Sequence, residues 1–299
     1  MRVLLTGASS GIGAETARLL ARRDHDVVLV ARGREGLERA AEEVRAHGTR
    51  AVVAVADVTD REALAAALQR GKDELGGIDA VIANAGATAY GPVADMPVED
   101  MERTLDVTLR GMINLVAVAL PELERTAGHI VVTGSVAARQ PLPLMAAYTA
   151  AKHGERGFVN ALRLELQATG SPVQVAMVHP GPVDTPFWDH VVPTAKMPPL
   201  LPAAYRPQDV ARAIVRQLES PRPEHVPGLA MRAMLLFRAL ARPVSDLALV
   251  AAANWALQNG SDRPPGRALH EASGDGTRTT EIDLHLGAWK DRALEALRP

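Results

Sequence analysis

The first two-thirds of the chain alternates short apolar runs with longer amphipathic stretches. The apolar runs are predicted as strands and cover residues 3–5, 27–30, 51–55, 80–82, 129–133 and 173–178. The amphipathic stretches are predicted as helices over 12–22, 34–46, 60–75, 98–124, 148–168 and 208–218. Strands that are apolar throughout and separated by helices indicate a parallel sheet covered on both faces. The predicted fold class is therefore α/β, a doubly wound parallel sheet with helices on both faces.

The pattern changes after residue 180. Prolines are dense from 180 to 207, which predicts a loop region with a flap over 186–206. An apolar helical stretch over 228–257, broken at Pro243, a polar loop over 259–280 and an amphipathic helix over 284–297 are expected to follow. We therefore expect a main domain over 1–220 and a C-terminal helical extension of the same domain over 221–299.

Composition excludes several functions. Hydrophobic residues make up 47% of the 299 positions, enough for a sizeable core, and the net charge of -2 argues against a nucleic-acid partner. The chain has no cysteine, so disulfides, thiolate metal sites and a cysteine nucleophile are excluded. Its nine histidines show no ligand spacing with carboxylates, and no metal site is predicted.

The apolar segments are too short to cross a bilayer. Gly7 interrupts the first apolar run far short of a signal peptide, and the run at 247–257 lacks the ~20 residues of a transmembrane helix. We therefore expect a cytoplasmic protein. The apolar patch at 231–237 is expected to pack on the sheet edge or on a second subunit. A lipid-facing helix anchored by Arg232 and Arg238 is the alternative.

The sequence LLTGASSGIG at 4–13 joins the first predicted strand to the first predicted helix. Its glycines, Gly7, Gly11 and Gly13, permit a tight turn and close approach of the backbone to a pyrophosphate. The following helix N-terminus supplies free N–H groups and partial positive charge. This Rossmann-like arrangement predicts a dinucleotide site within 1–220; the alternative is a glycine-rich turn without a ligand.

The end of the second predicted strand indicates which dinucleotide binds. NAD-binding folds carry Asp or Glu about 20 residues after the glycines, on the ribose hydroxyls. Here the sequence reads LVARGRE, with Ala31, Arg32 and Arg34 in place of a carboxylate. Arg32 can pair with a phosphate, which favours NADP. The alternative is that Arg32 is a solvated loop charge.

Tyr148 and Lys152 are separated by four residues in YTAAK, at the start of a predicted helix. This spacing places both side chains on one helical face. A cation beside a phenol favours the phenolate and lowers the pKa of the phenol from about 10. The pair is therefore a candidate proton donor near neutral pH.

Together these motifs resemble those of the short-chain dehydrogenase/reductase family. The resemblance covers roughly residues 1–220 and is carried, in order, by TGASSGIG at 6–13, DV at 57–58, NAG at 84–86, Ser135, YTAAK at 148–152 and PGPVDT at 180–185.

The resemblance implies a role for each matching residue. Tyr148 would be the general acid or base, Lys152 would lower its pKa and hold the nicotinamide ribose, and Ser135 would bind the substrate oxygen. A loop-capping hydroxyl is the alternative for Ser135. The residues implied to contact the cofactor are Gly7, Ser9, Ser10, Gly11, Ile12, Gly13, Arg32, Asp57, Val58, Asn84, Ala85, Gly86, Tyr148, Lys152, Pro180, Gly181, Val183 and Thr185.

One position departs from the family pattern. Relatives carry Asn within D-V-N-x-x-G, where it helps to connect the lysine to solvent, whereas this chain reads DVTLRG with Thr108. Thr108 is expected to bond the carbonyl four residues earlier and bend the helix. It is thus a candidate member of an altered proton relay, and Asn114 is a poor substitute.

These observations predict an NADP-dependent enzyme that interconverts a carbonyl and an alcohol on a small, hydrophobic substrate. The resemblance also implies a homodimer or homotetramer formed through the helices at 98–124 and 148–168. Two alternatives stay open: an NADP-binding sensor or scaffold without turnover, and a membrane-surface lipid-modifying reductase.

Overall fold

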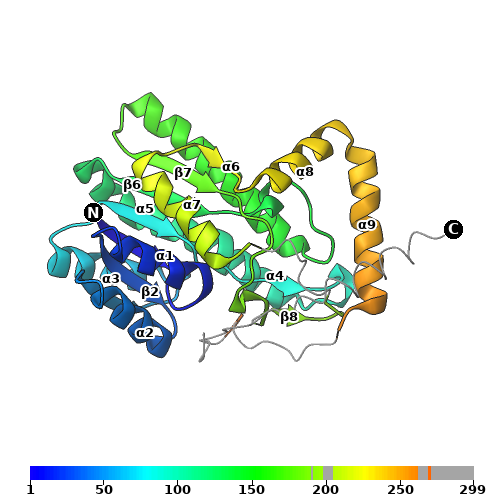
Figure 1. Ribbon diagram of the computed structural model, residues 1–299, viewed down its shortest axis with the longest axis horizontal. Coiled ribbons are helices and arrows are strands. Elements are labelled where there is room, and N and C mark those ends of the chain that lie inside the picture. The colour runs from blue at the N-terminus through cyan, green and yellow to red at the C-terminus, as the bar shows by residue number, and fades with distance from the viewer. Residues whose placement is uncertain (190, 198–204, 262–268, 271–299) are drawn as a thin grey trace.

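Seven parallel strands form one sheet in the order β3-β2-β1-β4-β6-β7-β9 (Figure 1). The computed structural model describes residues 1–189, 191–197, 205–261 and 269–270. The strands of this sheet are β1 Arg2–Thr6, β2 Asp26–Ala31, β3 Ala51–Val55, β4 Ala80–Ala83, β6 His129–Thr133, β7 Gln174–Val178 and β9 Glu224–His225. The strand order reverses beside β1, so the sheet is doubly wound as predicted.

Helices cover both faces of the sheet. Their bounds are α1 Gly11–Ala21, α2 Arg34–Arg45, α3 Arg61–Leu75, α4 Val98–Leu105, α5 Gly111–Thr126, α6 Ala146–Thr169 and α7 Pro207–Glu219. Helices α1, α2 and α7 pack on one face, and α3, α5 and α6 on the other. Neighbouring residues of a strand serve opposite faces: Leu4 of β1 joins the core under α3, while Val3 and Leu5 join the core under α1.

Strand β9 is absent from the sequence prediction. Its two residues pair in parallel with Met177 and Val178 of β7. A two-residue polar strand has no alternating or apolar run to reveal it, and only its docking beside β7 defines it.

The single helix predicted over 98–124 is interrupted. The π-helical segment η2, Asp106–Arg110, separates α4 from α5. The whole stretch Val98–Thr126 is long and apolar enough to cross a membrane by composition, but 50% of its most apolar window is buried inside the protein. It is placed as a core helix of the α/β domain.

Two further helices, α8 Leu229–Leu240 and α9 Arg242–Asn259, stand at one side of the sheet (Figure 1). Their junction lies at Ala241, and Pro243 falls in the first turn of α9, where proline is tolerated, rather than at the predicted break. The helix predicted over 284–297 and most of the predicted 259–280 loop lie outside the described residues.

The flap is held to the domain by a short second sheet. Strand β5, Ala89–Tyr90, pairs in parallel with β8, Val192–Pro193. Between β7 and β8, residues 186–189 form the short 3₁₀ helix η4. The remaining 3₁₀ helices are η1 Val93–Asp95 and η3 Val136–Ala138.

Candidate active site

A cleft of about 430 Å³ lies at the carboxyl ends of the strands. All the predicted site residues line it except Gly13 and Thr108. The cleft thus gathers loops that follow β1, β2, β3, β4, β6 and β7, which is where doubly wound sheets bind ligands.

The glycine-rich turn between β1 and α1 is closely packed. Gly7 and Gly11 have φ of +67° and +53°, a region that favours glycine. A Cβ on Gly13 would lie 1.9 Å from the carbonyl oxygen of Gly7, so no side chain fits there. The turn therefore presents bare backbone and the N-terminus of α1 to the cleft, which is a cradle for a pyrophosphate.

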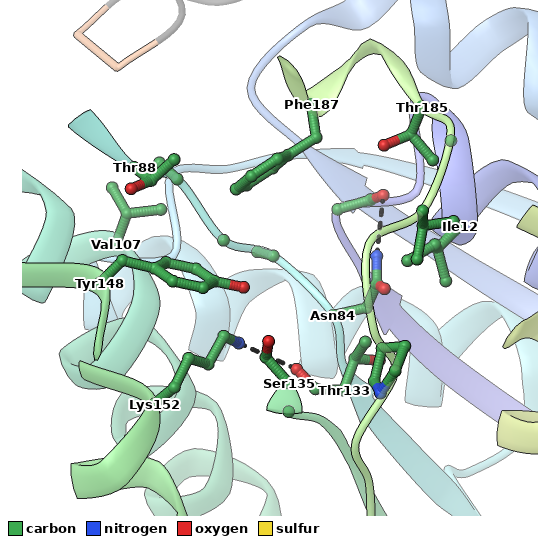
Figure 2. Close-up of a pocket in the computed structure, with 18 of the residues that line it drawn as sticks. Ile12, Asn84, Thr88, Val107, Thr133, Ser135, Tyr148, Lys152, Thr185 and Phe187 are labelled. Atoms are coloured by element: carbon green, nitrogen blue, oxygen red, sulfur yellow. Dashed lines mark hydrogen bonds between the residues drawn. The ribbon is translucent and has the colours of Figure 1, made fainter. Parts of the chain in front are cut away.

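Asn84, after β4, fastens this turn to the sheet. Its Nδ2 donates to the carbonyl oxygens of Thr6 and Gly7, both at 3.3 Å, and its backbone N–H donates to Thr6 Oγ1 at 3.1 Å. Figure 2 shows Asn84 between the turn and the rest of the site. The side chain predicted to line the cofactor thus also fixes the shape of the glycine turn.

Tyr148, Lys152 and Ser135 point toward one another at the other end of the cleft (Figure 2). Tyr148 and Lys152 share one face of α6, and Ser135 follows β6. Lys152 Nζ lies 5.6 Å from the centre of the Tyr148 ring and donates to the carbonyl oxygen of Thr133 at 2.9 Å. The predicted helical spacing therefore brings the phenol and the ammonium to the same spot.

The pKa of Tyr148 is nevertheless raised above its usual value. Burial is the largest cause; Lys152 and Ser135 act to lower the pKa, and the carboxylate of Glu155 raises it. The lowering by Lys152 is present as predicted, but the cost of burying a phenolate exceeds it.

Ser135 makes the loop-capping contact that was the alternative to a substrate-binding role. Its Oγ accepts a hydrogen bond from the backbone N–H of Ala137 at 3.1 Å and so caps η3. A hydroxyl that accepts one bond still has its own proton to donate. Capping therefore fixes the oxygen in place and leaves the O–H for a substrate oxygen.

Thr108 is fully buried in η2, but it does not bond the carbonyl four residues earlier. Its Oγ1 donates to the carbonyl oxygen of Ala87 at 3.0 Å and accepts from the N–H of Ala87 at 3.1 Å. That prediction is wrong because the loop after β4 offers both a donor and an acceptor to this hydroxyl. Asn114 is occupied elsewhere: its Nδ2 donates to the carbonyl of Val58 at 3.1 Å.

Arg32 and Asp57 follow β2 and β3 and line the same cleft. Burial lowers the pKa of Arg32, while Asp57 acts to raise it. The Asp57 carboxylate accepts from Thr59 and pairs with Arg103 at 2.5 Å. Arg32 and Arg103 both donate to the carbonyl oxygen of Leu269, at 3.4 and 3.0 Å. Two guanidinium groups therefore face the end of β2 and β3, where the sequence predicted one.

Apolar side chains close the cleft around Tyr148. Phe187 of η4 lies 6.0 Å from the Tyr148 ring, and Trp188 packs edge-on against Phe187 at 5.5 Å. Met231 and Met234 of α8 line the same cleft. Phe187 and Trp188, at the start of the predicted flap, thus line the cleft.

Sequence reasoning missed four residues at or beside the site. Arg103 fixes Asp57 from α4, Met231 and Met234 come from the C-terminal extension, and Glu155 lies beside Lys152. Only Glu155 had a sequence signal, since it is three residues after Lys152 and seven after Tyr148 on the same helix. Among the described residues, no group of three His, Cys, Asp or Glu is placed to hold a metal ion.

Three comparisons bear on this geometry. Residues 1–196 match the family model of the short chain dehydrogenases. The chain is 34% identical over 184 residues to the uncharacterized oxidoreductase Lin0452 of Listeria innocua, covering 61% of this chain and 74% of that one. Two solved structures, each 28% identical with a TM-score of 0.66, cover 76% of this chain. They are an alcohol dehydrogenase of Thermococcus sibiricus complexed with 5-hydroxy-NADP, 94% covered, and a short chain dehydrogenase of Mycobacterium paratuberculosis bound to NAD, 95% covered.

The family match coincides with the part of the chain that builds the cleft. It spans the glycine turn, the Asn84 loop, Ser135 and the Tyr148–Lys152 helix. The bare backbone cradle at Gly7 and Gly13 suits the pyrophosphate of a nicotinamide cofactor, which this fold binds. The chain therefore belongs to the short-chain dehydrogenase/reductase family of oxidoreductases.

Proposed function

We propose that this protein is an NADP(H)-dependent oxidoreductase that interconverts a carbonyl and an alcohol on a small, apolar substrate. The observation that carries the proposal is the convergence of Tyr148, Lys152 and Ser135 in a cleft that Arg32 also lines. The first group supplies proton chemistry, and Arg32 supplies a cation at the end of β2, where Ala31 stands at the position of the usual carboxylate.

Each residue has a distinct task in the proposed reduction. The Ser135 hydroxyl donates a hydrogen bond to the substrate carbonyl oxygen, and the Tyr148 phenol transfers its proton to the same atom. The charge of Lys152 then stabilises the phenolate that remains. A bound nicotinamide supplies the hydride in this direction and accepts it in the other.

NADP rather than NAD is proposed from the charges around Arg32. A 2′-phosphate would meet Arg32, and the carboxylate that commonly binds the ribose hydroxyls is replaced by Ala31. The neighbouring Asp57 is already neutralised by Arg103. The two structures of similar fold hold an NADP derivative and NAD, respectively, so the fold alone does not select the cofactor. The proposed preference therefore depends on the side chains around Arg32.

The cofactor proposal is tested by fluorescence titration with NADPH and, separately, NADH. We expect NADPH to bind at least tenfold more tightly, about 1.4 kcal/mol. Arg32→Glu should abolish this preference. Arg34→Glu is the matched control, because Arg34 lies two residues further on, is 70% exposed and pairs with Glu38. Equal binding of both cofactors by the unaltered protein would contradict the proposal.

The chemical proposal is tested with a panel of apolar ketones and aldehydes. Tyr148→Phe should reduce turnover by about 10²–10⁴-fold and leave NADPH affinity within about twofold, because only the proton donor is lost. Tyr90→Phe is the control, since Tyr90 is buried in β5 outside the cleft. Tight NADPH binding without turnover of any carbonyl would favour the sensor or scaffold function instead.

A membrane-surface reductase is a second candidate, favoured by the exposed face of α8 and α9. Leu229, Leu240 and Leu247 are 82%, 79% and 69% exposed. Arg238, however, is 11% exposed and pairs with Asp246, so it is not the lipid anchor that the sequence suggested. Flotation with anionic liposomes distinguishes this candidate: co-flotation supports it, and protein left in the bottom fraction rules it out.

A further inference from the structure

Glu155 lies one helical turn beyond Lys152 on the inner face of α6. Tyr148, Lys152 and Glu155 are separated by four and then three residues, so they form a row along that face. Glu155 is 1% exposed and Lys152 is 4% exposed. A carboxylate thus shares the buried environment of the candidate proton-donating pair.

The carboxylate of Glu155 faces the ammonium of Lys152 with both oxygens. Its Oε1 and Oε2 lie 3.1 and 3.0 Å from Lys152 Nζ. Among the described residues, Lys152 is the only side chain that pairs with the Glu155 carboxylate, and Glu155 is the only side chain that accepts from Nζ. Thr133 contributes the other acceptor, a backbone carbonyl oxygen at 2.9 Å.

Stability does not explain a carboxylate at this position. The buried residues that follow on the same face are apolar, including Val159 and Leu162. A well-packed hydrophobic residue in place of a buried ion pair is often neutral or stabilising, because removing two charges from water is costly. The effect of Glu155 therefore falls mainly on the charge and position of Lys152.

The charges of the three residues are coupled. Burial raises the pKa of Glu155 to about 7, although Lys152 acts to lower it. Burial would lower the pKa of Lys152, but Glu155 and Tyr148 together raise it above its usual value. Glu155 also raises the pKa of Tyr148, in opposition to Lys152. The carboxylate thus offsets part of the cation's influence on the phenol.

Other charged groups near α6 are engaged elsewhere. On η2, Arg110 pairs with Asp106 in an exposed position, and Arg103 of α4 pairs with Asp57. His179, after β7, faces the Ser135 carbonyl and Glu224. The hydroxyl of the uncharged Thr108 is hydrogen-bonded to the backbone of Ala87. Lys152 and Tyr148 are therefore the titratable groups that respond to Glu155.

We propose that Glu155 is a positioning residue of the active site, which fixes the ammonium of Lys152 and moderates its charge beside Tyr148. The inference rests on the proposed function, because it assigns Glu155 a part in the proton chemistry of Tyr148. In this arrangement the tendency of Tyr148 to release its proton beside Lys152 depends on the carboxylate of Glu155 on the same helix.

The test compares Glu155→Gln with the unaltered protein. Glutamine keeps the shape and an acceptor for Nζ but removes the negative charge. The high-pH limb of kcat/KM for carbonyl reduction should therefore move to lower pH by about one unit, because the unopposed ammonium promotes loss of the phenol proton. Glu155→Asp, which keeps the charge, should restore the limb at least in part.

Glu122→Gln is the matched control. Glu122 is also a buried carboxylate, 6% exposed, and pairs with Lys72 and Arg125 away from the cleft. Its loss removes a buried carboxylate and its two ion pairs without touching Lys152, so the pH profile should stay in place. A profile of Glu155→Gln that superimposes on that of the unaltered protein, or moves to higher pH, would overturn the inference.

A second readout does not require a substrate. The ultraviolet absorbance of the phenolate, with the signal of Tyr148→Phe subtracted, reports ionisation of Tyr148 directly. Ionisation should begin about one pH unit lower in Glu155→Gln, and an unchanged or raised midpoint refutes the role of Glu155. If the unaltered protein reduces no carbonyl, the proposed function fails, yet this titration still decides the electrostatic role. Glu155→Val replaces Glu155→Gln if the latter does not fold.

Discussion

The two hydrogen bonds between the Thr108 hydroxyl and the Ala87 backbone lead to a prediction that distinguishes a structural role of Thr108 from a catalytic one. Thr108→Val keeps the side-chain shape but removes the hydroxyl that donates to the Ala87 carbonyl at 3.0 Å and accepts from the Ala87 N–H at 3.1 Å. Each unsatisfied buried group costs about 1–3 kcal/mol. Because Ala87 is only half-buried, we take the lower end and expect a total loss of about 2 kcal/mol.

Urea unfolding monitored by circular dichroism measures this loss. Thr169→Val is the matched control. The Thr169 hydroxyl bonds the carbonyls of Glu165 and Leu166 at 3.0 and 3.2 Å near the exposed end of α6, where water can replace it. The free energy of unfolding of this variant should change by less than about 0.5 kcal/mol. The Thr108 variant should also bind NADPH more weakly, since Ala87 lines the cleft, while the pH profile of turnover is unchanged. Equal stability of the two variants would refute the bonding argument. A shifted pH profile would instead support a relay through Thr108.

Two further predictions follow from other parts of the site. Gly13→Ala should weaken NADPH binding at least tenfold, about 1.4 kcal/mol, because the added Cβ would lie 1.9 Å from the Gly7 carbonyl oxygen. Gly157→Ala is the control, since a Cβ at Gly157 meets nothing within 4 Å. Equal NADPH affinities of the two variants in titration would disprove the reasoning. His179 is fully buried, and burial lowers its pKa to about 4. Below pH 6.5 the imidazole of His179 takes up a proton in the unfolded chain, whereas in the folded protein it stays neutral down to about pH 4. The free energy of unfolding therefore falls as pH drops from about 6.5 to about 4, by a total of about 3 kcal/mol. His179→Gln should flatten this acid limb in urea titrations at pH values across that range, and an unaltered limb would exclude His179 as its source.

The local features of the cleft were predictable from the sequence. A strand, a glycine turn and a helix occur in direct succession at 2–21, and Tyr148 and Lys152 are separated by one helical turn. Each of these features depends on neighbours within a few residues, where backbone sterics and helical periodicity act strongly. The apolar strands likewise identify a buried parallel sheet, whose strand ends gather the loops that carry Ser135 and Asn84.

The tertiary structure decided the features that join distant parts of the chain. Strand β9 exists because Glu224 and His225 dock on β7, and Arg103 neutralises Asp57 from 46 residues away. The hydroxyl of Thr108 bonds Ala87 rather than its own helix, because burial brings an unpaired loop donor and acceptor to it.

The pKa of Tyr148 shows most clearly where prediction from the sequence ends. The sequence by itself determined that an ammonium would lie beside this phenol, from their separation on one helix. It did not determine how far the folded protein would remove this phenol from water, nor that the carboxylate of Glu155 would oppose the ammonium. Helical periodicity is a property of the local chain, whereas desolvation depends on everything packed around the site, and only the folded protein decides which effect is larger.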